Sequence, residues 1–461
     1  MSQPPPFKGG YTYDMLESLD PVDHRETRLS NSPGRTGISW KLWASALALV
    51  LLLVAGSTFF AVQAVAGALQ GTTRSGTRGY GGPEDQLDKV SECCRFTVVA
   101  WETQQLTLLA LSWLLLPAVG HIQEEDLATT RRFFTLTRAL STTELAINRT
   151  DPGILKDAMT EGYQNLNRER QRLELPTQRV LAALISRRLA AEGLAQPLPL
   201  RADVVWPPVA FTIQRPPSVL VVSPRKEIKL ERTTVLEPGL TDQQVVELEQ
   251  GAAALGWSSL VEPTGGYSTY PTIITDSASL SFALQAAAHE WTHTYLFFHP
   301  LGFNYFKSQE MRTINETVAD LVGQEVSKKI MSEYFDSNPP AARGRQDAEF
   351  DFPAEMRKTR LEAERLLAQG NVDEAEGYME ERRKVFVQHG YNIRKLNQAY
   401  FAFHGTYADS PASVSPIGPQ LAQLFEKSGS VGQFVKVLAP VGSFGDYQAL
   451  LKRYGILEAR P

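Results

Sequence analysis

The chain has 461 residues, of which 43% are apolar, and a formal net charge of −5. This length predicts two or three domains with real cores, and the absence of a strongly basic domain argues against a nucleic-acid partner. The cysteines, Cys93 and Cys94, are adjacent, so their spacing excludes a CxxC metal or redox site and a disulfide framework.

The amino-terminal part predicts a membrane anchor. Residues 1–39 are rich in Pro, Gly, Ser and charged side chains, which is typical of a disordered tail. Residues 40–70 hold an apolar run long enough for one transmembrane helix, and 71–85 has the composition of a flexible linker. The run is too long for an ordinary signal peptide, although cleavage near Ala66–Ala68 and a buried core helix are the alternatives.

The orientation of this anchor follows from flanking charges. Slightly more basic residues precede the run than follow it, namely Arg25, Arg28, Arg35 and Lys41 against Arg74, Arg78 and Lys89. The bias favours a cytoplasmic amino terminus and an extracytoplasmic remainder. A shorter apolar run at 106–122 contains Pro117 and is interpreted as a buried or membrane-surface helix; if it also crossed, the remainder would face the cytoplasm.

The rest of the chain predicts an α+β fold that is mostly helical. Apolar periodicity indicates helices over about 86–196, within a helical region at 86–200, with a break at 148–153. We expect a core over 201–335, in which a small sheet precedes two helices. A helical domain over 336–461 should complete a cleft beside this core. The expected strands are 208–213, 218–224, 227–236 and 265–275, with a helix at 243–255 and a later helical hairpin at 360–386.

The most informative motif is the HEWTH stretch at residues 289–293, in a helix for which Asp276 or Ser277 is the expected N-cap. On a helix, His289 and His293 lie on one face, about 40° apart, so that both imidazoles can bind one metal ion. Glu290 then lies beside the open coordination position. The pattern predicts one zinc ion, with Glu290 as general base.

A catalytic zinc ion needs a third protein ligand, and the run at 311–326 offers one on a second helix. Glu316 and Asp320 are one turn apart, so Glu316 can complete the ligand set while Asp320 accepts a hydrogen bond from a ligating histidine. Glu310 and Glu325 are the rival third ligands.

HEWTH followed by NETVAD, after a gap of 22 residues, resembles the gluzincin metallopeptidases, a group that includes thermolysin and neprilysin. The resemblance covers about 205–330. It implies a sheet whose edge strand holds an extended peptide, and Gly266 and Tyr267 are the expected contacts. GGYSTY stands where the aminopeptidases of this group have GxMEN, which leaves the choice between endopeptidase and exopeptidase open.

A polar stripe in the carboxyl-terminal region is a candidate wall of the cleft. Asn397, Tyr400, His404 and Tyr407 share one face if the segment is helical. We expect His404, or else Tyr407, to stabilise the oxyanion, as a histidine or tyrosine does in related metallopeptidases, and Tyr400 to contact substrate. These side chains are equally compatible with buried structural polar groups.

The sequence therefore predicts a membrane-anchored zinc peptidase that acts on a peptide or protein. One alternative is a membrane-tethered helical interaction protein with a structural or inactive metal site. Another is a zinc amidohydrolase with a non-peptide substrate. Glu290 favours an enzyme, because a structural metal site has no need of an acid between its ligands.

Overall fold

The computed structural model describes residues 83–115, 121–198, 201–335, 350–408 and 410–457, which all belong to one compact unit. The predicted tail at 1–39, the predicted membrane helix at 40–70 and all but the last residues of the 71–85 linker lie outside this part of the chain. Within the described ranges, no helix has both the length and the apolar character that crossing a bilayer requires.

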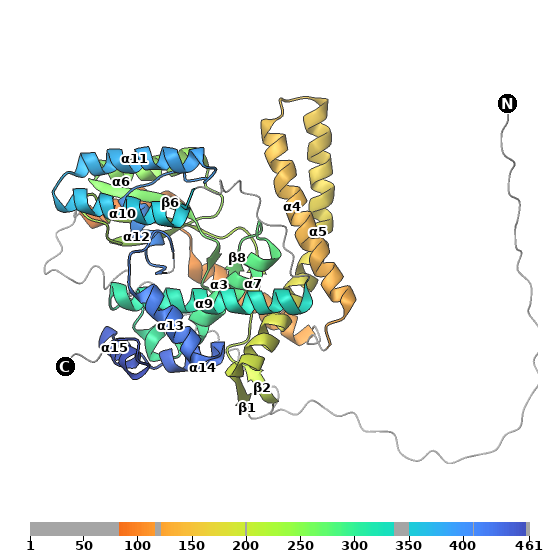
Figure 1. Ribbon diagram of the computed structural model, residues 1–461. Coiled ribbons are helices and arrows are strands. Elements are labelled where there is room, and N and C mark those ends of the chain that lie inside the picture. Colours follow the sequence, from red (N-terminus) through yellow and green to blue (C-terminus); the bar gives the residue numbers. More distant parts are fainter. Residues whose placement is uncertain (1–82, 116–120, 199–200, 336–349, 409, 458–461) are drawn as a thin grey trace, which may run out of the picture. The chain divides into compact units, whose positions relative to one another are not determined.

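The first half of the described chain is helical, as expected. It contains α2 Pro83–Ser91, α3 Val98–Leu115, α4 Glu124–Arg149 and α5 Ile154–Leu189. Helices α4 and α5 form a long hairpin (Figure 1), which confirms the break at 148–153. The helical region expected over 86–200 ends in a short strand, because β1 Ala195–Leu198 pairs antiparallel with β2 Arg201–Val205.

A three-stranded antiparallel sheet follows, in the order β5-β4-β6. Its strands are β5 Arg232–Leu236, β4 Ser218–Pro224 and β6 Trp257–Pro263. Because side chains alternate along a strand, Leu220 and Val222 pack toward α6 Asp242–Ala254, while Val219 and Val221 pack toward α12 Gln398–His404. The sheet is thus covered on both faces, which explains the nearly continuous burial of β4.

A second small sheet lies nearer the motif helices. Strand β3 Phe211–Ile213 runs parallel to β8 Thr272–Ile274, and β8 pairs antiparallel with β7 Gly266–Tyr267. The expected single strand at 265–275 is therefore wrong: the chain turns between β7 and β8, where Pro271 has no N–H for a strand ladder. Strand β6 was not predicted, and the strand expected at 227–236 begins only at residue 232.

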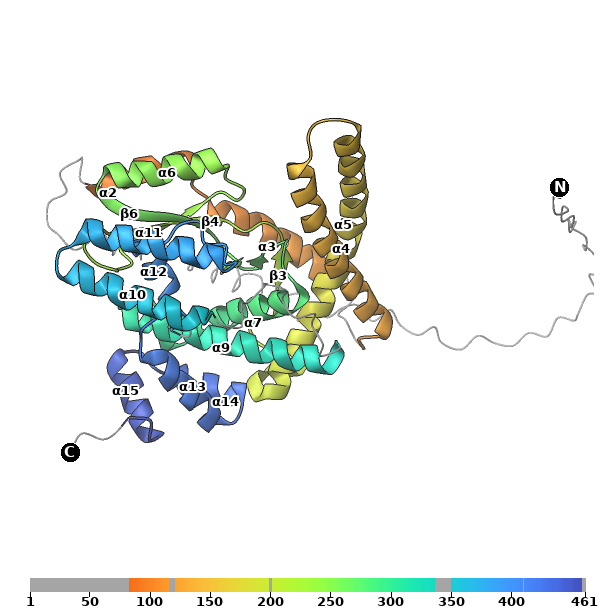
Figure 2. The same ribbon diagram turned by 45° about the horizontal axis from the view of Figure 1, so that its top comes forward.

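The main core joins α4 and α5 to the motif helices and to the last helices of the chain. The motif helices are α7 Leu280–Phe297 and α9 Gln309–Tyr334, joined through α8 Pro300–Phe303. The remaining helices are α10 Phe352–Ala368, α11 Val372–Gln388, α13 Ile417–Ser428, α14 Val431–Leu438 and α15 Phe444–Arg453. Helices α10 and α11 form the expected hairpin (Figure 2), and the mostly helical α+β class is confirmed.

Candidate metal centre

Helices α7 and α9 lie side by side (Figures 1 and 2) and carry the motif residues. Ser279 caps α7, since its hydroxyl accepts a hydrogen bond from the Phe282 amide at 3.2 Å, so the predicted cap at Asp276 or Ser277 is wrong by two or three residues. Helix α7 is buried on nearly all sides, and many of its buried side chains are alanine or aromatic.

Gly323 of α9 allows the two helix backbones to approach closely. A Cβ atom at this position would stand 2.7 Å from the carbonyl oxygen of Gln285 and 3.2 Å from Cβ of His289. The contact therefore lies at the level of the first motif histidine. It fixes how far Glu316, two turns earlier on α9, stands from the imidazoles of α7.

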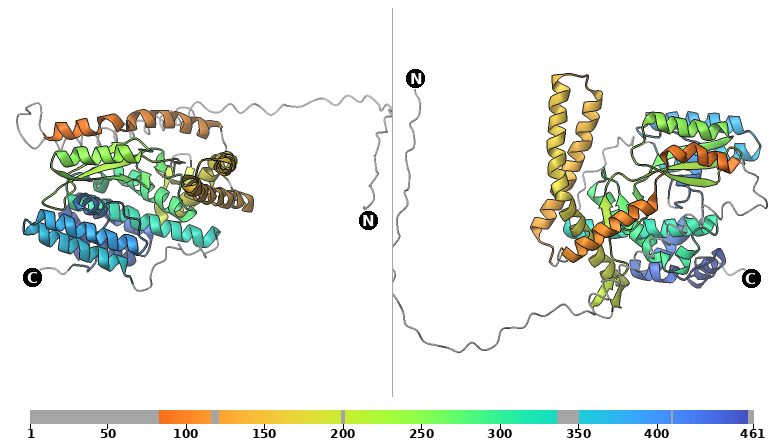
Figure 3. Two further views of the ribbon diagram at one scale, coloured as in Figure 1. Left: turned by 90° about the horizontal axis from the view of Figure 1, so that it is seen from above. Right: turned by 180° about the vertical axis from the view of Figure 1, so that it is seen from behind.

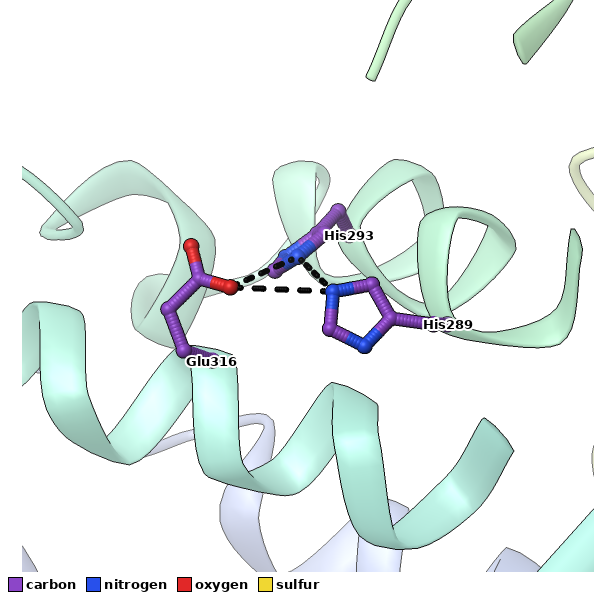
Figure 4. A group of neighbouring side chains, drawn as sticks. All are labelled: His289, His293 and Glu316. Atoms are coloured by element: carbon purple, nitrogen blue, oxygen red, sulfur yellow. Dashed lines mark hydrogen bonds and ion pairs between the residues drawn. The ribbon is translucent and has the colours of Figure 1, made fainter. Parts of the chain in front are cut away.

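Figure 4 shows His289, His293 and Glu316 turned toward one common point. The Nε2 atoms of the two histidines are 3.0 Å apart. Oε2 of Glu316 lies 3.6 Å from Nε2 of His289 and 3.4 Å from Nε2 of His293. The structure thus brings together the three expected metal ligands. The rivals lie elsewhere: Glu310 is exposed, and Glu325 pairs with Lys329 at 3.4 Å.

These three atoms have the spacing that one tetrahedral metal ion requires. Ligand atoms held about 2.0–2.2 Å from such an ion stand about 3.3–3.6 Å apart. The observed separations of 3.0, 3.4 and 3.6 Å bracket that range. Two imidazoles and a carboxylate form a group that can hold one ion with little movement of the side chains.

The charges around the group favour a bound cation. Burial opposes ionisation of Glu316, but the neighbouring His293 and His289 outweigh it and hold the pKa of Glu316 well below its usual range. Burial likewise opposes protonation of His289, yet the carboxylates of Asp320 and Glu316 raise its pKa to about 10. Three carboxyl groups, those of Asp320, Glu316 and Glu290, thus act on His289 and outnumber the two imidazoles, which favours a cation at this point.

Two polar side chains orient the ligands through their far atoms. Nδ1 of His293 donates to Oδ1 of Asn315 at 2.7 Å, and the amide of Asn315 donates to the Leu301 carbonyl at 3.3 Å. The hydroxyl of Tyr305 donates to Oε1 of Glu316, which leaves Oε2 turned toward the histidines. Both contacts preset the ligand atoms before an ion binds.

Asp320 stands where its expected role requires, but at a longer range than a direct hydrogen bond. Its Oδ1 lies 3.6 Å from Nδ1 of His289 and accepts from the side chain of Gln285 at 3.4 Å. Its charge acts on His289 across that gap. Of the two histidines that could bind an ion, His293 has the closer orienting partner, which is Asn315.

Glu290 lies on the same cavity as the three ligands. Burial raises the pKa of its carboxyl group above the usual range, against the opposing charges of His289 and His293. A Cβ on Gly266 would stand 3.0 Å from Oε1 of Glu290, so this glycine leaves room for the carboxylate. A buried carboxyl group with a raised pKa beside a metal site is suited to accept and return a proton.

The cavity has a volume of about 320 Å³, and its walls are largely apolar around the histidines and glutamates of the motifs. Gly266, Tyr267 and Tyr407 of the expected site residues line it. The ring of Tyr407 lies 6.2 Å from that of His289 between centroids. Tyr407 therefore lies beside the group formed by His289, His293 and Glu316, and its role as an oxyanion donor stays a prediction.

The predicted polar stripe does not form on one helix. Helix α12 spans Gln398–His404, Asn397 is its N-cap, and Tyr407 lies beyond its end. His404 and Tyr400 are not among the residues that line the cavity. Nε2 of His404 lies 3.6 Å from Glu262, and its ring packs 4.3 Å from that of Tyr400. These two side chains belong to the contact between α12 and β6.

Sequence reasoning did not single out Tyr305, Asn315 or Glu102, which all line the cavity. Asn315 had a usable signal, because it directly precedes the third ligand on a helix. Tyr305 is in the turn before α9, and Glu102 is in α3, far from the motifs along the chain. Only the tertiary fold brings them to the site.

Comparisons of this chain with protein-family models, with curated proteins and with solved structures found no match.

Proposed function

We propose that this protein is a zinc-dependent peptidase of the gluzincin type. The observation that carries the proposal is the triangle of His289, His293 and Glu316 with Glu290 on the same buried cavity. A metal site that serves only to stabilise a fold is closed by four protein ligands, whereas a catalytic one leaves a position open. Three ligands and an adjacent acid favour catalysis.

Zinc is the proposed ion because two imidazoles and one carboxylate form the ligand set of many catalytic zinc sites. His289, His293 and Glu316 would hold it. When bound, zinc supplies a Lewis acid that lowers the pKa of a water molecule and polarises a substrate carbonyl group. The excess of carboxylates around the histidines supports a divalent cation at this point.

Glu290 is the proposed general base and acid. It accepts a proton from the attacking water as the water oxygen bonds to the peptide carbonyl carbon. When the C–N bond breaks, Glu290 passes that proton to the departing amine nitrogen. Its raised pKa supports the first half of this exchange, because it makes the carboxylate a stronger base toward the proton of the water.

Tyr407 is the proposed donor to the oxyanion. His404 is not, because its Nε2 atom lies 3.6 Å from the carboxylate of Glu262 instead. The charge of Glu316 and burial keep the pKa of the Tyr407 hydroxyl well above its usual value. Its proton therefore stays in place at neutral pH and is available for a hydrogen bond. Tyr305, whose pKa burial and Glu316 also raise, orients the third ligand.

A peptide is the proposed substrate class because a strand borders the cavity. Gly266 and Tyr267 of β7 line it, and β7 pairs with β8 on one side. An extended peptide can add to the other side of such a strand through main-chain hydrogen bonds. This feature favours a peptide over a small non-peptide amide.

The proposed location is a membrane, with residues 40–70 as the anchor and the catalytic part outside the cytoplasm. The support is the uncharged apolar run together with the basic residues before it. A reporter fused after Pro461 tests the topology. Reporter activity on the cytoplasmic side would contradict a single crossing with an inside amino terminus.

The function is tested with the full-length chain in three forms: wild type, Glu290→Gln and Glu310→Gln. Each is assayed for bound zinc and for cleavage of a peptide library. We expect one equivalent of zinc in all three and cleavage in wild type and Glu310→Gln only, because Glu310 is exposed on the same helix as Glu316. Cleavage by Glu290→Gln at the wild-type rate would remove Glu290 from the mechanism.

A further inference from the structure

Glu102 is a buried carboxylate that α3 carries into the metal-site cavity. Helices α2 and α3 are the orange helices of Figure 3, and α3 precedes the motif helices by more than 150 residues. The Glu102 side chain is 4% exposed and lines the same cavity as Glu290. Its Oε1 accepts a hydrogen bond from the amide of Tyr270 at 3.2 Å.

The described residues supply no positive charge to Glu102. Burial raises its pKa to about 7, and the opposing influence is the one hydrogen bond from the Tyr270 amide. Arg312 is the arginine that lines the cavity, but it lies over the rings of Tyr305 and Phe306, at 5.6 and 5.8 Å from their centroids. A carboxylate removed from water without a cation is costly, so its retention calls for a reason.

Two buried glutamates that do not line this cavity are neutralised by lysine and arginine. Glu249, 7% exposed, is bound by Lys395 at 3.0 Å and by Arg394. Glu192, 8% exposed, is bound by Lys329 at 2.8 Å and by Arg188 at 3.0 Å. The fold thus pairs structural glutamates with cations, and Glu102 departs from that pattern on the wall of a cavity.

Glu102, Tyr267 and Glu290 line one cavity. Tyr267 of β7 is within electrostatic range of both acids, since burial and the charges of Glu102 and Glu290 raise the pKa of its hydroxyl. The neighbouring Tyr270 amide ties Glu102 to the turn that follows β7. A group bound by Glu102 therefore belongs to a molecule that occupies the same cavity as Glu290.

We propose that Glu102 is a specificity-determining residue that binds a positively charged group of the substrate. This inference rests on the proposed peptidase function and names its substrate class. The group is an ammonium or guanidinium, from either a free amino terminus or a Lys or Arg side chain. It supplies the counter-charge that the described residues do not, on the wall of the cavity that also holds Glu290.

The test uses full-length wild type, Glu102→Gln and the control Glu92→Gln. Glu92 is exposed and precedes α3. It is six residues before Val98, which is the first residue of α3 and lines the cavity. The substrates are matched peptides that differ by lysine against norleucine, or by a free against an acetylated amino terminus. We expect wild type and Glu92→Gln to prefer one cationic form by about tenfold or more in kcat/KM. The responding pair identifies the source of the charge.

Glu102→Gln should lose that preference while it still cleaves the neutral peptide, since the amide can accept the same hydrogen bond from Tyr270. An unchanged preference, or none in wild type, overturns the assignment. The same peptides are titrated onto Glu290→Gln and onto the Glu102→Gln, Glu290→Gln double variant, which measures binding without cleavage. If wild type cleaves nothing, the peptidase proposal fails, and these titrations decide the role of Glu102 separately.

Discussion

Gly323→Ala tests whether the close contact between α7 and α9 sets the metal geometry. The new Cβ would stand 2.7 Å from the carbonyl oxygen of Gln285, and an ordinary contact there begins at 3.4 Å. The helices must therefore separate locally by up to 3.4 − 2.7, or about 0.7 Å. Zinc ligand distances tolerate about 0.2 Å, so this displacement is large for the site.

The expected energy follows from two opposing terms. Alanine is better than glycine within a helix by about 1 kcal/mol, while crowding a packed interface costs about 1–3 kcal/mol. Gly323→Ala should thus lower the free energy of unfolding by up to about 2 kcal/mol and weaken zinc binding at least tenfold. Gly377→Ala is the matched control: it lies within α11 with open space around its Cβ, and should gain about 0.5–1 kcal/mol.

Denaturant unfolding and competitive zinc titration measure both effects on the full-length chain. The reasoning fails if Gly323→Ala is as stable as Gly377→Ala and binds zinc like wild type. That result would mean that α7 and α9 are not held together as closely as the contact at Gln285 requires.

Three further predictions concern single side chains. Because burial raises the pKa of Glu102 from 4.5 to about 7, the folded chain keeps a proton that the unfolded chain releases, and stability falls as pH rises through this interval. The Glu102 carboxyl group accounts for up to about 3 kcal/mol of this decrease in the free energy of unfolding. Glu102→Gln should abolish that part, as measured by denaturant unfolding at a series of pH values. Tyr407→Phe should lower kcat by about 10²-fold with zinc retained, and His404→Ala much less, in steady-state assays. Asn315→Ala should weaken zinc binding by about 10–100-fold in competition with a chelator, since His293 loses its orienting partner.

The metal ligands could be found from the sequence because helix geometry is local. Residues four apart share a face wherever the helix lies, so His289 and His293 needed no knowledge of the fold. Glu316 required one more assumption, that the second helix packs on the first, and the structure brings it within 3.4 Å of His293. In long helices with regular apolar periodicity, the sequence pattern alone therefore indicates which side chains lie on the same face.

The cavity walls could not be found in this way because they depend on how distant elements pack. The stripe from Asn397 to Tyr407 was read as one helix, but α12 ends at His404, so Tyr407 turns to the metal group and His404 to Glu262. Glu102 lies just before the apolar run at 106–122, and nothing in its local sequence indicates a role. Strand β6 was missed because its buried face forms only when β4 lies beside it.

The ligand environment of bound zinc tests the central claim most directly. X-ray absorption spectroscopy on the purified full-length chain, with one equivalent of zinc bound, reports the number of imidazoles and the type of the other ligands. We predict two imidazoles at about 2.0–2.1 Å with oxygen ligands and no sulfur, and loss of zinc in His293→Ala. Sulfur ligation, or full zinc binding by His293→Ala, would contradict a site built from His289, His293 and Glu316.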